Sequence, residues 1–287
     1  MQLFARLLLS ISILGAFCPM FAQVQVYFTN EPKSNLQLLN TGTGVITTLY
    51  SIGGEPDDLT LNSFGQLLYT VPATGTVNLY DPTTGVNSVL ATGVKYARDL
   101  CIEPGGETML VAINSPGKIM RYNFTSGSYV LFAQKLGGAV DGIAYDAYNN
   151  LYAVVGHNTI KQLNPVTGAV LNTLTLEPHV GINGADGLTL DPYTGNLWAT
   201  HAGATGKGVI QIFTLPQGGF PATGFNLYLF TKQLSGSAPD GIKSDGKGTL
   251  YVGAINTLFE YDIPTNTITH NWVVKGADGV SLVPGTF

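Results

Sequence analysis

The chain has 287 residues, of which 45% are hydrophobic and only 11% are charged, and its formal net charge is −5 at pH 7. This acidic balance comes without any cluster of lysine and arginine, which argues against nucleic-acid binding. Phosphate-binding loops, paired-cysteine metal sites and the His-Glu-x-x-His zinc motif are also missing from the sequence.

Residues 1–22 have the pattern of a secretory signal peptide. A lone Arg6 is followed by an apolar run from Leu7 to Phe17 and by Ala22 at the expected cleavage site. The run is too short for a comfortable membrane span, and a strand pattern follows it directly. We therefore expect an exported protein, periplasmic or extracellular, in which residues 23–287 form a single domain without a membrane span. Its one remaining cysteine, Cys101, is expected to be a buried apolar residue.

A sequence motif recurs six times along the chain. It consists of an aspartate-containing turn, a short apolar strand, a tight turn and a second strand that ends near Tyr or Trp. One copy runs from Asp186 to Trp198 and another from Asp240 to Tyr251. Successive copies are 41, 43, 45, 54 and 38 residues apart, counted between Asp57, Arg98, Asp141, Asp186, Asp240 and Asp278. This period is typical of a repeat architecture and leaves room for four short strands per unit.

The second half of each unit predicts two further strands joined by sharp turns. Examples are residues 81–85 and 164–168, where Asp-Pro, Asn-Pro and Thr-Gly pairs are turn chemistry. Four antiparallel strands repeated radially predict an all-β fold, a six-bladed β-propeller. The last copy stops after one strand, whereas residues 24–29 match a second strand. The N- and C-terminal strands are therefore expected to share one blade and close the ring.

The repeats resemble two related groups of six-bladed propellers. One is the gluconolactonase and regucalcin family, and the other is the NHL-repeat propellers, including the virginiamycin B lyase type. The resemblance spans the mature chain and is carried by 239–252 and by 186–191 with 195–200. In the gluconolactonase-like family, a Glu, Asn residues and an Asp at the starts of innermost strands hold a divalent metal at one channel mouth. Asp240 matches that Asp, but the equivalent positions here include no Glu or Asn, and one is Arg98.

Two interpretations of the recurring aspartates stay open. In the first, they ring the channel mouth and hold a divalent cation (Ca²⁺, Mg²⁺ or Zn²⁺), with Arg98 neutralising part of their charge; the candidate ligands are Asp57, Asp141, Asp186, Asp240 and Asp278. In the second, each aspartate turns back onto nearby backbone N–H groups and shapes the start of its strand. Recurrence in five units favours the second interpretation, because a site usually breaks symmetry whereas scaffold chemistry repeats.

The strongest break in symmetry lies in the loops before Asp186 and after Trp198. Both loops are expected on one face of the propeller, so one side of the funnel should collect His179, Asn183, Asp186, His201 and Lys207, joined by His157. Histidine beside a metal or carboxylate is the usual general base, which makes His201 and His179 the candidate catalytic residues; a solvated surface role is the alternative. Further candidate ligand-binding residues are Arg98, Asn30 and Glu31.

Three functions fit these features. A secreted propeller that binds a small molecule, glycan or protein at its funnel needs only the fold and the loops, and we prefer this function. The alternatives are a metal-dependent lactonase or related hydrolase, and a lyase of the virginiamycin B type. Both alternatives use the aspartates and a histidine, and the sequence does not separate them. The protein is expected to be a monomer.

Overall fold

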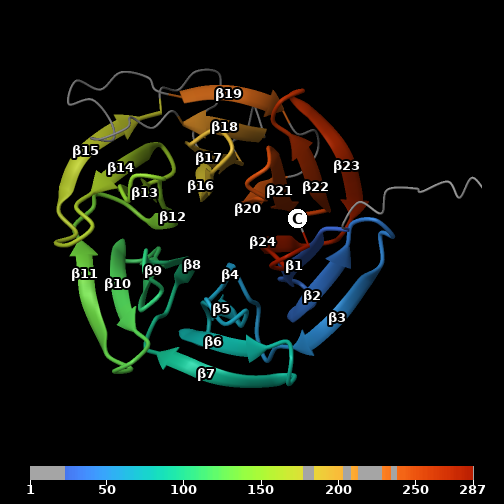
Figure 1. Cartoon of the computed structure of the whole chain (residues 1–287). Helices are drawn as coiled ribbons and strands as arrows, with labels where there is room; N and C mark the ends of the chain where they lie inside the picture. Colours follow the sequence, from blue (N-terminus) through green and yellow to red (C-terminus); the bar gives the residue numbers. More distant parts are fainter. Residues whose placement is uncertain (1–22, 177–183, 203–207, 213–227, 234–237, 287) are drawn as a thin grey trace, which may run out of the picture.

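The computed structural model describes residues 23–176, 184–202, 208–212, 228–233 and 238–286. In these ranges the chain forms six four-stranded antiparallel sheets arranged radially around a central axis (Figure 1). The predicted six-bladed, all-β propeller is confirmed. The predicted signal peptide, residues 1–22, lies outside the described ranges. No helix of the described part is long and apolar enough to cross a membrane.

We number the blades in chain order and give the strands of each blade from the axis outward. Blade 1 consists of β24 (Ala277–Leu282), β1 (Gln25–Asn30), β2 (Asn35–Asn40) and β3 (Ile46–Ser51). Blade 2 consists of β4 (Leu59–Leu61), β5 (Leu67–Val71), β6 (Thr76–Asp81) and β7 (Val86–Thr92). Blade 3 consists of β8 (Ala97–Ile102), β9 (Thr108–Ile113), β10 (Lys118–Asn123) and β11 (Tyr129–Gln134).

The remaining three blades follow the same order. Blade 4 consists of β12 (Val140–Tyr145), β13 (Leu151–Val155), β14 (Thr159–Leu163) and β15 (Val170–Thr175). Blade 5 consists of β16 (Ala185–Asp191), β17 (Asn196–His201), β18 (Gly208–Ile212) and β19 (Tyr228–Gln233). Blade 6 consists of β20 (Pro239–Ser244), β21 (Thr249–Ala254), β22 (Thr257–Asp262) and β23 (Thr267–Val273).

Turn chemistry separates the strands as the sequence predicts. The Asp81 carboxylate accepts the Thr83 N–H at 2.8 Å, and Gly85 ends that turn with a φ of 72°. Asn164 accepts the Val166 N–H at 2.9 Å in the matching turn of blade 4. A positive φ favours glycine, and a short polar side chain satisfies the turn's backbone, so these residues fix where each strand stops.

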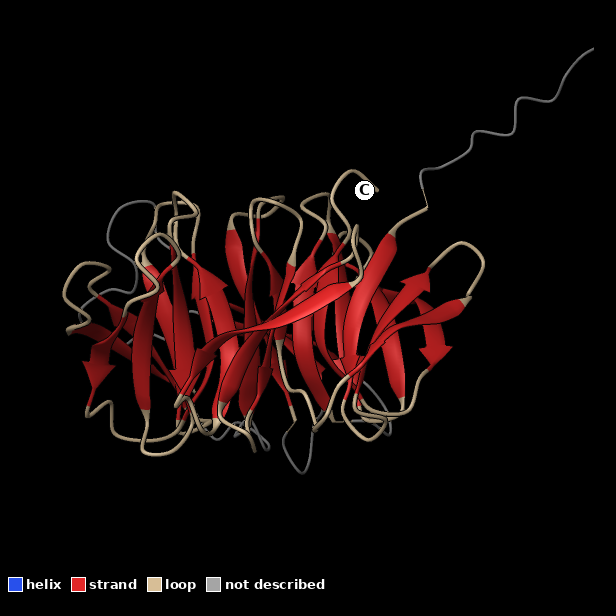
Figure 2. Ribbon diagram, turned by 90° about the horizontal axis from the view of Figure 1, so that it is seen from below, coloured by secondary structure: helices blue, strands red, loops and turns tan. Residues whose placement is uncertain are grey.

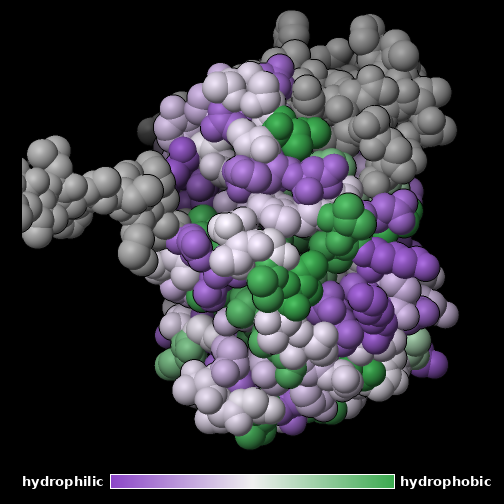
Figure 3. Space-filling model, turned by 90° about the vertical axis from the view of Figure 1, so that its right-hand side faces the viewer, coloured by the Kyte–Doolittle hydropathy of each residue, from purple (hydrophilic) through white to green (hydrophobic). Residues whose placement is uncertain are grey.

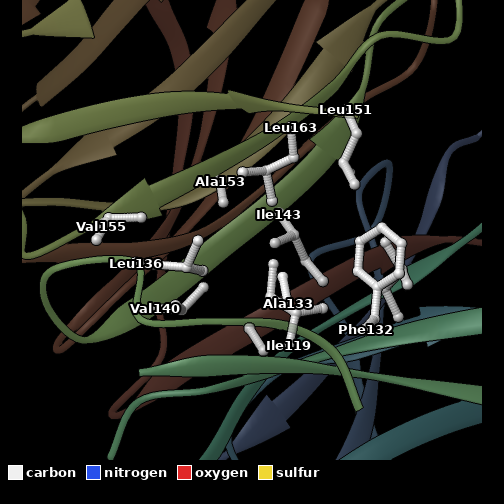
Figure 4. Close-up of a cluster of buried hydrophobic side chains, with 12 residues drawn as sticks. Ile119, Phe132, Ala133, Leu136, Val140, Ile143, Leu151, Ala153, Val155 and Leu163 are labelled. Atoms are coloured by element: carbon white, nitrogen blue, oxygen red, sulfur yellow. The ribbon is translucent and has the colours of Figure 1, made fainter. Parts of the chain in front are cut away.

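Apolar side chains fill the space between neighbouring blades. Among the described residues there are six buried clusters, and each joins residues of two adjacent blades. Figure 4 shows the cluster between blades 3 and 4, where Ile119 and Phe132 of one blade face Ile143 and Leu151 of the other. The recurring aromatic side chains are core residues, as expected, with exposed fractions of at most 2%: Tyr69, Tyr152, Trp198 and Tyr251.

Outer strands are exposed on one face, so most of their residues are exposed or half-buried. In β23, for example, the pattern is mostly exposed, and Val273 is 89% exposed. Figure 3 shows one side of the molecule, where apolar residues lie among hydrophilic ones. By contrast, all five residues of β5 are buried, because second strands pack against a neighbouring blade on either side. The outer strands thus form the exposed surface of the propeller, and the second strands belong to its core.

A polar network ties blades 3 and 4 together near the turn that follows β8. Arg121 donates to Glu103 from Nε at 2.6 Å and from a terminal nitrogen at 2.7 Å, and it also donates to the Pro165 carbonyl. Thr108 and Tyr145 hydroxyls donate to the same carboxylate at 2.6 and 2.7 Å. Every oxygen of Glu103 is therefore paired, as a buried carboxylate requires.

The ring closes between the two ends of the chain, as predicted. In blade 1, β1 pairs with β24 so that Val26 lies opposite Leu282 and Asn30 opposite Ala277. Beyond these strands the Val283 N–H donates to the Gln25 carbonyl at 2.9 Å. Both ends leave the same face of the propeller (Figure 2). That face is opposite the one at which the innermost strands begin, because β24 starts at Ala277 and ends at Leu282.

Candidate ligand-binding site at the channel mouth

The innermost strands bring the six recurring positions together around the axis. They lie at or just before the start of β4, β8, β12, β16, β20 and β24, and all six line one cavity of about 410 Å³ in the central channel. The members of this set, which we call the mouth ring, are Asp57, Arg98, Asp141, Asp186, Asp240 and Asp278. The alignment of the six sequence repeats therefore predicted correctly that these six positions lie together around the axis.

Four of the five ring carboxyls have a partner. Arg98 forms an ion pair with Asp57. The Asn114 amide donates to Asp141 at 2.6 Å, and His157 Nδ1 lies 3.3 Å from the other Asp141 oxygen. The carboxyls of Asp240 and Asp278 interact with each other, and a hydrogen bond between them requires that one of the two carries a proton.

Asp186 differs from the other four. Among the described residues its carboxyl has no hydrogen bond and no ion pair, although the residue is half-buried in the channel. In addition, none of the five ring carboxyls accepts a backbone N–H within the described ranges. The interpretation in which each aspartate folds back onto its own backbone therefore finds no support in these contacts.

Burial and mutual repulsion dominate the electrostatics of the mouth ring. Burial first, and then the charges of Asp240 and Asp141, raise the pKa of Asp186 above its ordinary value. Burial and the charge of Asp240 likewise raise the pKa of Asp57, which the Arg98 guanidinium opposes. One guanidinium among five carboxyls leaves an excess of negative charge in a poorly solvated space. The mouth ring is thus a region in which a positive charge or hydrogen-bond donors would be favoured.

A second layer of charged residues lies below the mouth ring and was not singled out from the sequence. The Leu100 N–H donates to Asp58 at 3.2 Å and to Asp99 at 2.6 Å, and the Ile143 N–H donates to Asp99 at 2.5 Å. Burial raises the pKa of Asp99 to about 6. Burial and then the charge of Asp99 raise that of Asp58 well above its ordinary value. Lys243 also lines this part of the channel.

The sequence does indicate this second layer, because two of the six repeats have an aspartate where the other four have a glycine. Four units have glycine directly after the ring aspartate: Gly142, Gly187, Gly241 and Gly279. A Cβ on Gly142 would lie 2.2 Å from the Asp186 carbonyl, and one on Gly241 2.3 Å from that of Asp278, so the innermost strands touch there. Blades 2 and 3 carry Asp58 and Asp99 at this position instead, which breaks the symmetry inside the channel.

Two further predicted residues do lie at the mouth. His157 occupies the turn between β13 and β14 with a φ of 63°, and its side chain is 52% exposed. It lines a hollow of about 450 Å³ together with Asp186. Glu31 lines another hollow, of about 530 Å³, with Asp186, Asp240 and Asp278. Burial and then the charge of Glu55 raise the pKa of Glu31.

The remaining predicted residues fall elsewhere. His201 is the last residue of β17 and is fully buried, so its predicted place on a loop is wrong. The strand extends to it because His201 pairs with both Ala185 and Gly208. Asn30 is also buried, at the end of β1, where it donates to Gln37 and accepts the Lys33 N–H. Three predicted residues lie outside the described residues: His179, Asn183 and Lys207.

The mouth ring can be tested as a metal site from its donors. Within the described ranges, no group of three or more His, Cys, Asp or Glu side chains is placed to hold a metal ion. Arg98 takes one ring position, and Asp240 and Asp278 engage each other. Hard cations such as Ca²⁺ need six to eight converging oxygens. The residues as placed do not form such a site, so the predicted divalent cation stays a prediction.

Fold and site together define a six-bladed β-propeller with an acidic channel mouth. No family model matches the sequence, and no curated protein matches it. Among solved structures, a chain of a nidogen/laminin complex superimposes with a TM-score of 0.72 at 13% identity, covering 91% of this chain and 98% of that one.

Two further structures share the architecture. Virginiamycin B lyase from Staphylococcus aureus gives a TM-score of 0.63 at 15% identity, covering 89% of this chain and 86% of that one. Hydrazine synthase of Kuenenia stuttgartiensis gives 0.64 at 15% identity, covering 83% and 73%. The predicted resemblance to propellers of the virginiamycin B lyase type is thus confirmed as a likeness of fold. At these identities the fold is all that is shared.

Proposed function

We propose that the protein is an exported binding protein that takes up a small polar ligand at the mouth of its central channel. Export rests on the signal-peptide pattern of residues 1–22. Uptake rests on the mouth ring, which lines a channel cavity of about 410 Å³. Cavities of this size hold small ligands, and convergent polar groups inside them provide specificity.

The observation that carries this proposal is the electrostatic state of the mouth ring. Five carboxyls face one channel, and burial with mutual repulsion raises the pKa values of Asp57, Asp186 and Asp278. The ring carboxyls make no backbone hydrogen bonds in the described part of the chain, so the shaping of strand starts does not account for this arrangement. Strongly perturbed carboxyls in a cleft are typical of functional sites. A ligand that brings donors or positive charge would relieve the repulsion.

The test is a thermal-shift and calorimetric screen of the purified protein against chemical classes: amines, amino acids, neutral sugars, lactones and short peptides. A ligand of the channel should raise the melting temperature of the protein by mass action. Its binding should weaken in Asp240→Asn, which removes a ring carboxyl, and should change in Lys243→Met, which removes the cation of the second layer. Glu107→Gln removes an exposed charge from the opposite face and serves as the matched control. A ligand whose binding is the same in all three variants would show that the channel is not the site.

A second candidate function, a hydrolase or lyase, is favoured by one pair of residues. Asp141 lies 3.3 Å from His157 Nδ1, and the imidazole is about half exposed at the mouth. A carboxylate on Nδ1 holds the ring so that Nε2 faces outward, which is how a general base is oriented. In the same screen, a lactone that is opened by the protein and not by His157→Gln would support this function. Repeating the assay with Ca²⁺, Mg²⁺ or Zn²⁺, together with metal analysis, tests the predicted cation. Lactones left unchanged under all these conditions would exclude the hydrolase.

A further inference from the structure

We propose that Asp186 is the carboxylate that contacts the ligand, and that the group it binds is an organic ammonium. This inference rests on the proposed binding function and narrows it to one residue and one ligand class. Three independent features of the channel lead to it: the partners of the ring carboxyls, the hollows that meet at Asp186, and the number of oxygens that converge there.

The first feature is the pairing of the ring carboxyls. Asp57 is matched by Arg98, Asp141 by Asn114 and His157, and Asp240 by Asp278. Within the described ranges, only the Asp186 carboxyl is left without a hydrogen bond or an ion pair. A half-buried carboxylate that neighbouring carboxyls repel is destabilised unless something pairs with it. Its position inside the channel makes a ligand the natural partner.

The second feature is the place of Asp186 among the hollows of the mouth. It lines the channel cavity of about 410 Å³, the hollow of about 530 Å³ beside Glu31, and the hollow of about 450 Å³ beside His157. No other mouth-ring residue lines all three of these hollows. A molecule bound in any of them can therefore reach Asp186. Asp186 therefore borders each of the three hollows that could hold the rest of a ligand molecule.

The third feature separates an ammonium from a metal ion. A divalent cation needs several converging oxygens, and the described residues form no group of three or more suitable side chains. An ammonium instead donates up to three hydrogen bonds and needs only one close carboxylate for a charge-assisted contact. The surrounding carboxyls of Asp141 and Asp240 add a favourable field, since their charges act on Asp186. The site therefore fits a localised positive charge on a larger organic body.

The experiment compares amines with neutral molecules of nearly the same shape, using calorimetry and thermal shift on the purified full chain. The probes are n-hexylammonium with hexanol, 1,4-diaminobutane with 1,4-butanediol, and glucosamine with glucose. We expect an amine to bind while its neutral counterpart does not, and we expect added salt to weaken the binding. In Asp186→Asn, the affinity for the amine should fall by at least about tenfold. In the control Glu107→Gln, it should change by less than about twofold.

The outcomes also separate this inference from the proposed function. Equal binding of amines and neutral counterparts, or amine binding that survives Asp186→Asn, would overturn the inference and leave channel binding intact. The same holds if only Ca²⁺ or another divalent ion binds at the mouth. If no probe of any class binds in the channel, both proposals fail. Because Asp186→Asn removes a repelled charge, we expect it to fold, and its melting curve confirms this before binding is measured.

Discussion

The mouth ring and the Glu103 network hold the same chemical group in opposite surroundings. At the mouth, burial and neighbouring carboxyls raise the pKa values of Asp57, Asp186 and Asp278. Near the turn after β8, burial alone would raise the pKa of Glu103, but hydrogen bonds from Arg121 and two hydroxyls outweigh it and lower the value. The mouth ring has more carboxyl groups than partners for them, whereas both carboxylate oxygens of Glu103 have hydrogen-bond donors.

This difference indicates that the two regions have different roles. The Glu103 network fills its own hydrogen-bonding capacity, so it contributes to the contact between blades 3 and 4 and has nothing left for a ligand. The mouth ring has hydrogen-bonding capacity that no protein group fills. Because its carboxyls also repel one another, we expect it to lower the stability of the unbound protein. Functional sites often carry such a cost, and stabilising changes there tend to reduce function. Substitutions in these two regions test the contrast.

Removing the cation of the Glu103 network should have the largest effect. Arg121→Met leaves the buried Glu103 carboxylate without its cationic partner and with only two hydroxyl donors, and we expect a loss of about 3 kcal/mol in the free energy of unfolding near neutral pH. Since the folded pKa of Glu103 is lowered, this contribution is present above its ordinary value of 4.5 and disappears as the pH falls through the folded value. Urea denaturation at several pH values measures both effects. The double variant Arg121→Met, Glu103→Gln should recover part of the loss, and a double variant no better than the single one would contradict this account.

Removing one ring charge should have the opposite sign. We expect Asp186→Asn to increase the free energy of unfolding by on the order of 1–2 kcal/mol at about pH 8, because it relieves repulsion in a medium of intermediate dielectric. The folded pKa of Asp186 is raised above 3.8, so its destabilising effect is absent below pH 3.8, grows as the pH rises from there to the folded pKa, and is constant above it. The gain should therefore vanish near pH 4. A variant that is less stable than the parent at pH 8 would show that Asp186 has a stabilising partner.

The smallest effect concerns a single hydroxyl of the Glu103 network. Tyr145→Phe removes a donor 2.7 Å from the carboxylate, and we expect a loss of about 1 kcal/mol. Tyr148→Phe is the matched control, because that ring is 52% exposed and its hydroxyl takes no part in the network. Thermal melts of the two variants side by side are sufficient. Equal melting temperatures would mean that the Tyr145 hydroxyl is dispensable to the network.

The fold was predictable from the sequence because its determinants are local and repeated. Turn pairs such as Asp-Pro and Thr-Gly mark strand ends, and the spacing of the aspartates gives the number of blades. The shared blade followed from residues 24–29 matching a second strand, which the pairing of β1 with β24 confirms. The mouth ring was also predictable, since one register position in a propeller returns to the same place around the axis.

The parts of the site that were missed depend on contacts between blades. Asn114 reaches Asp141 from the neighbouring blade, and no spacing in the sequence indicates that contact. Asp58 and Asp99 stand where other units have glycine, a difference that carries meaning only once the close approach of the innermost strands is known. His201 is predicted in a loop because the loop is expected to follow Trp198, whereas the pairing of β17 continues to His201.

Because residues 23 and 286, the described ends of the chain, lie at the face opposite the mouth ring, we expect a handle attached at the C-terminal end to point away from the proposed site (Figure 2). A propeller attached to a surface by its C-terminus should present its channel openly to the solution. The same geometry would apply to any neighbour fused at that end: it would sit behind the ring and leave the approach to Asp186 unobstructed. The closing of the ring by β1 and β24 thus also sets the direction in which the molecule faces its surroundings.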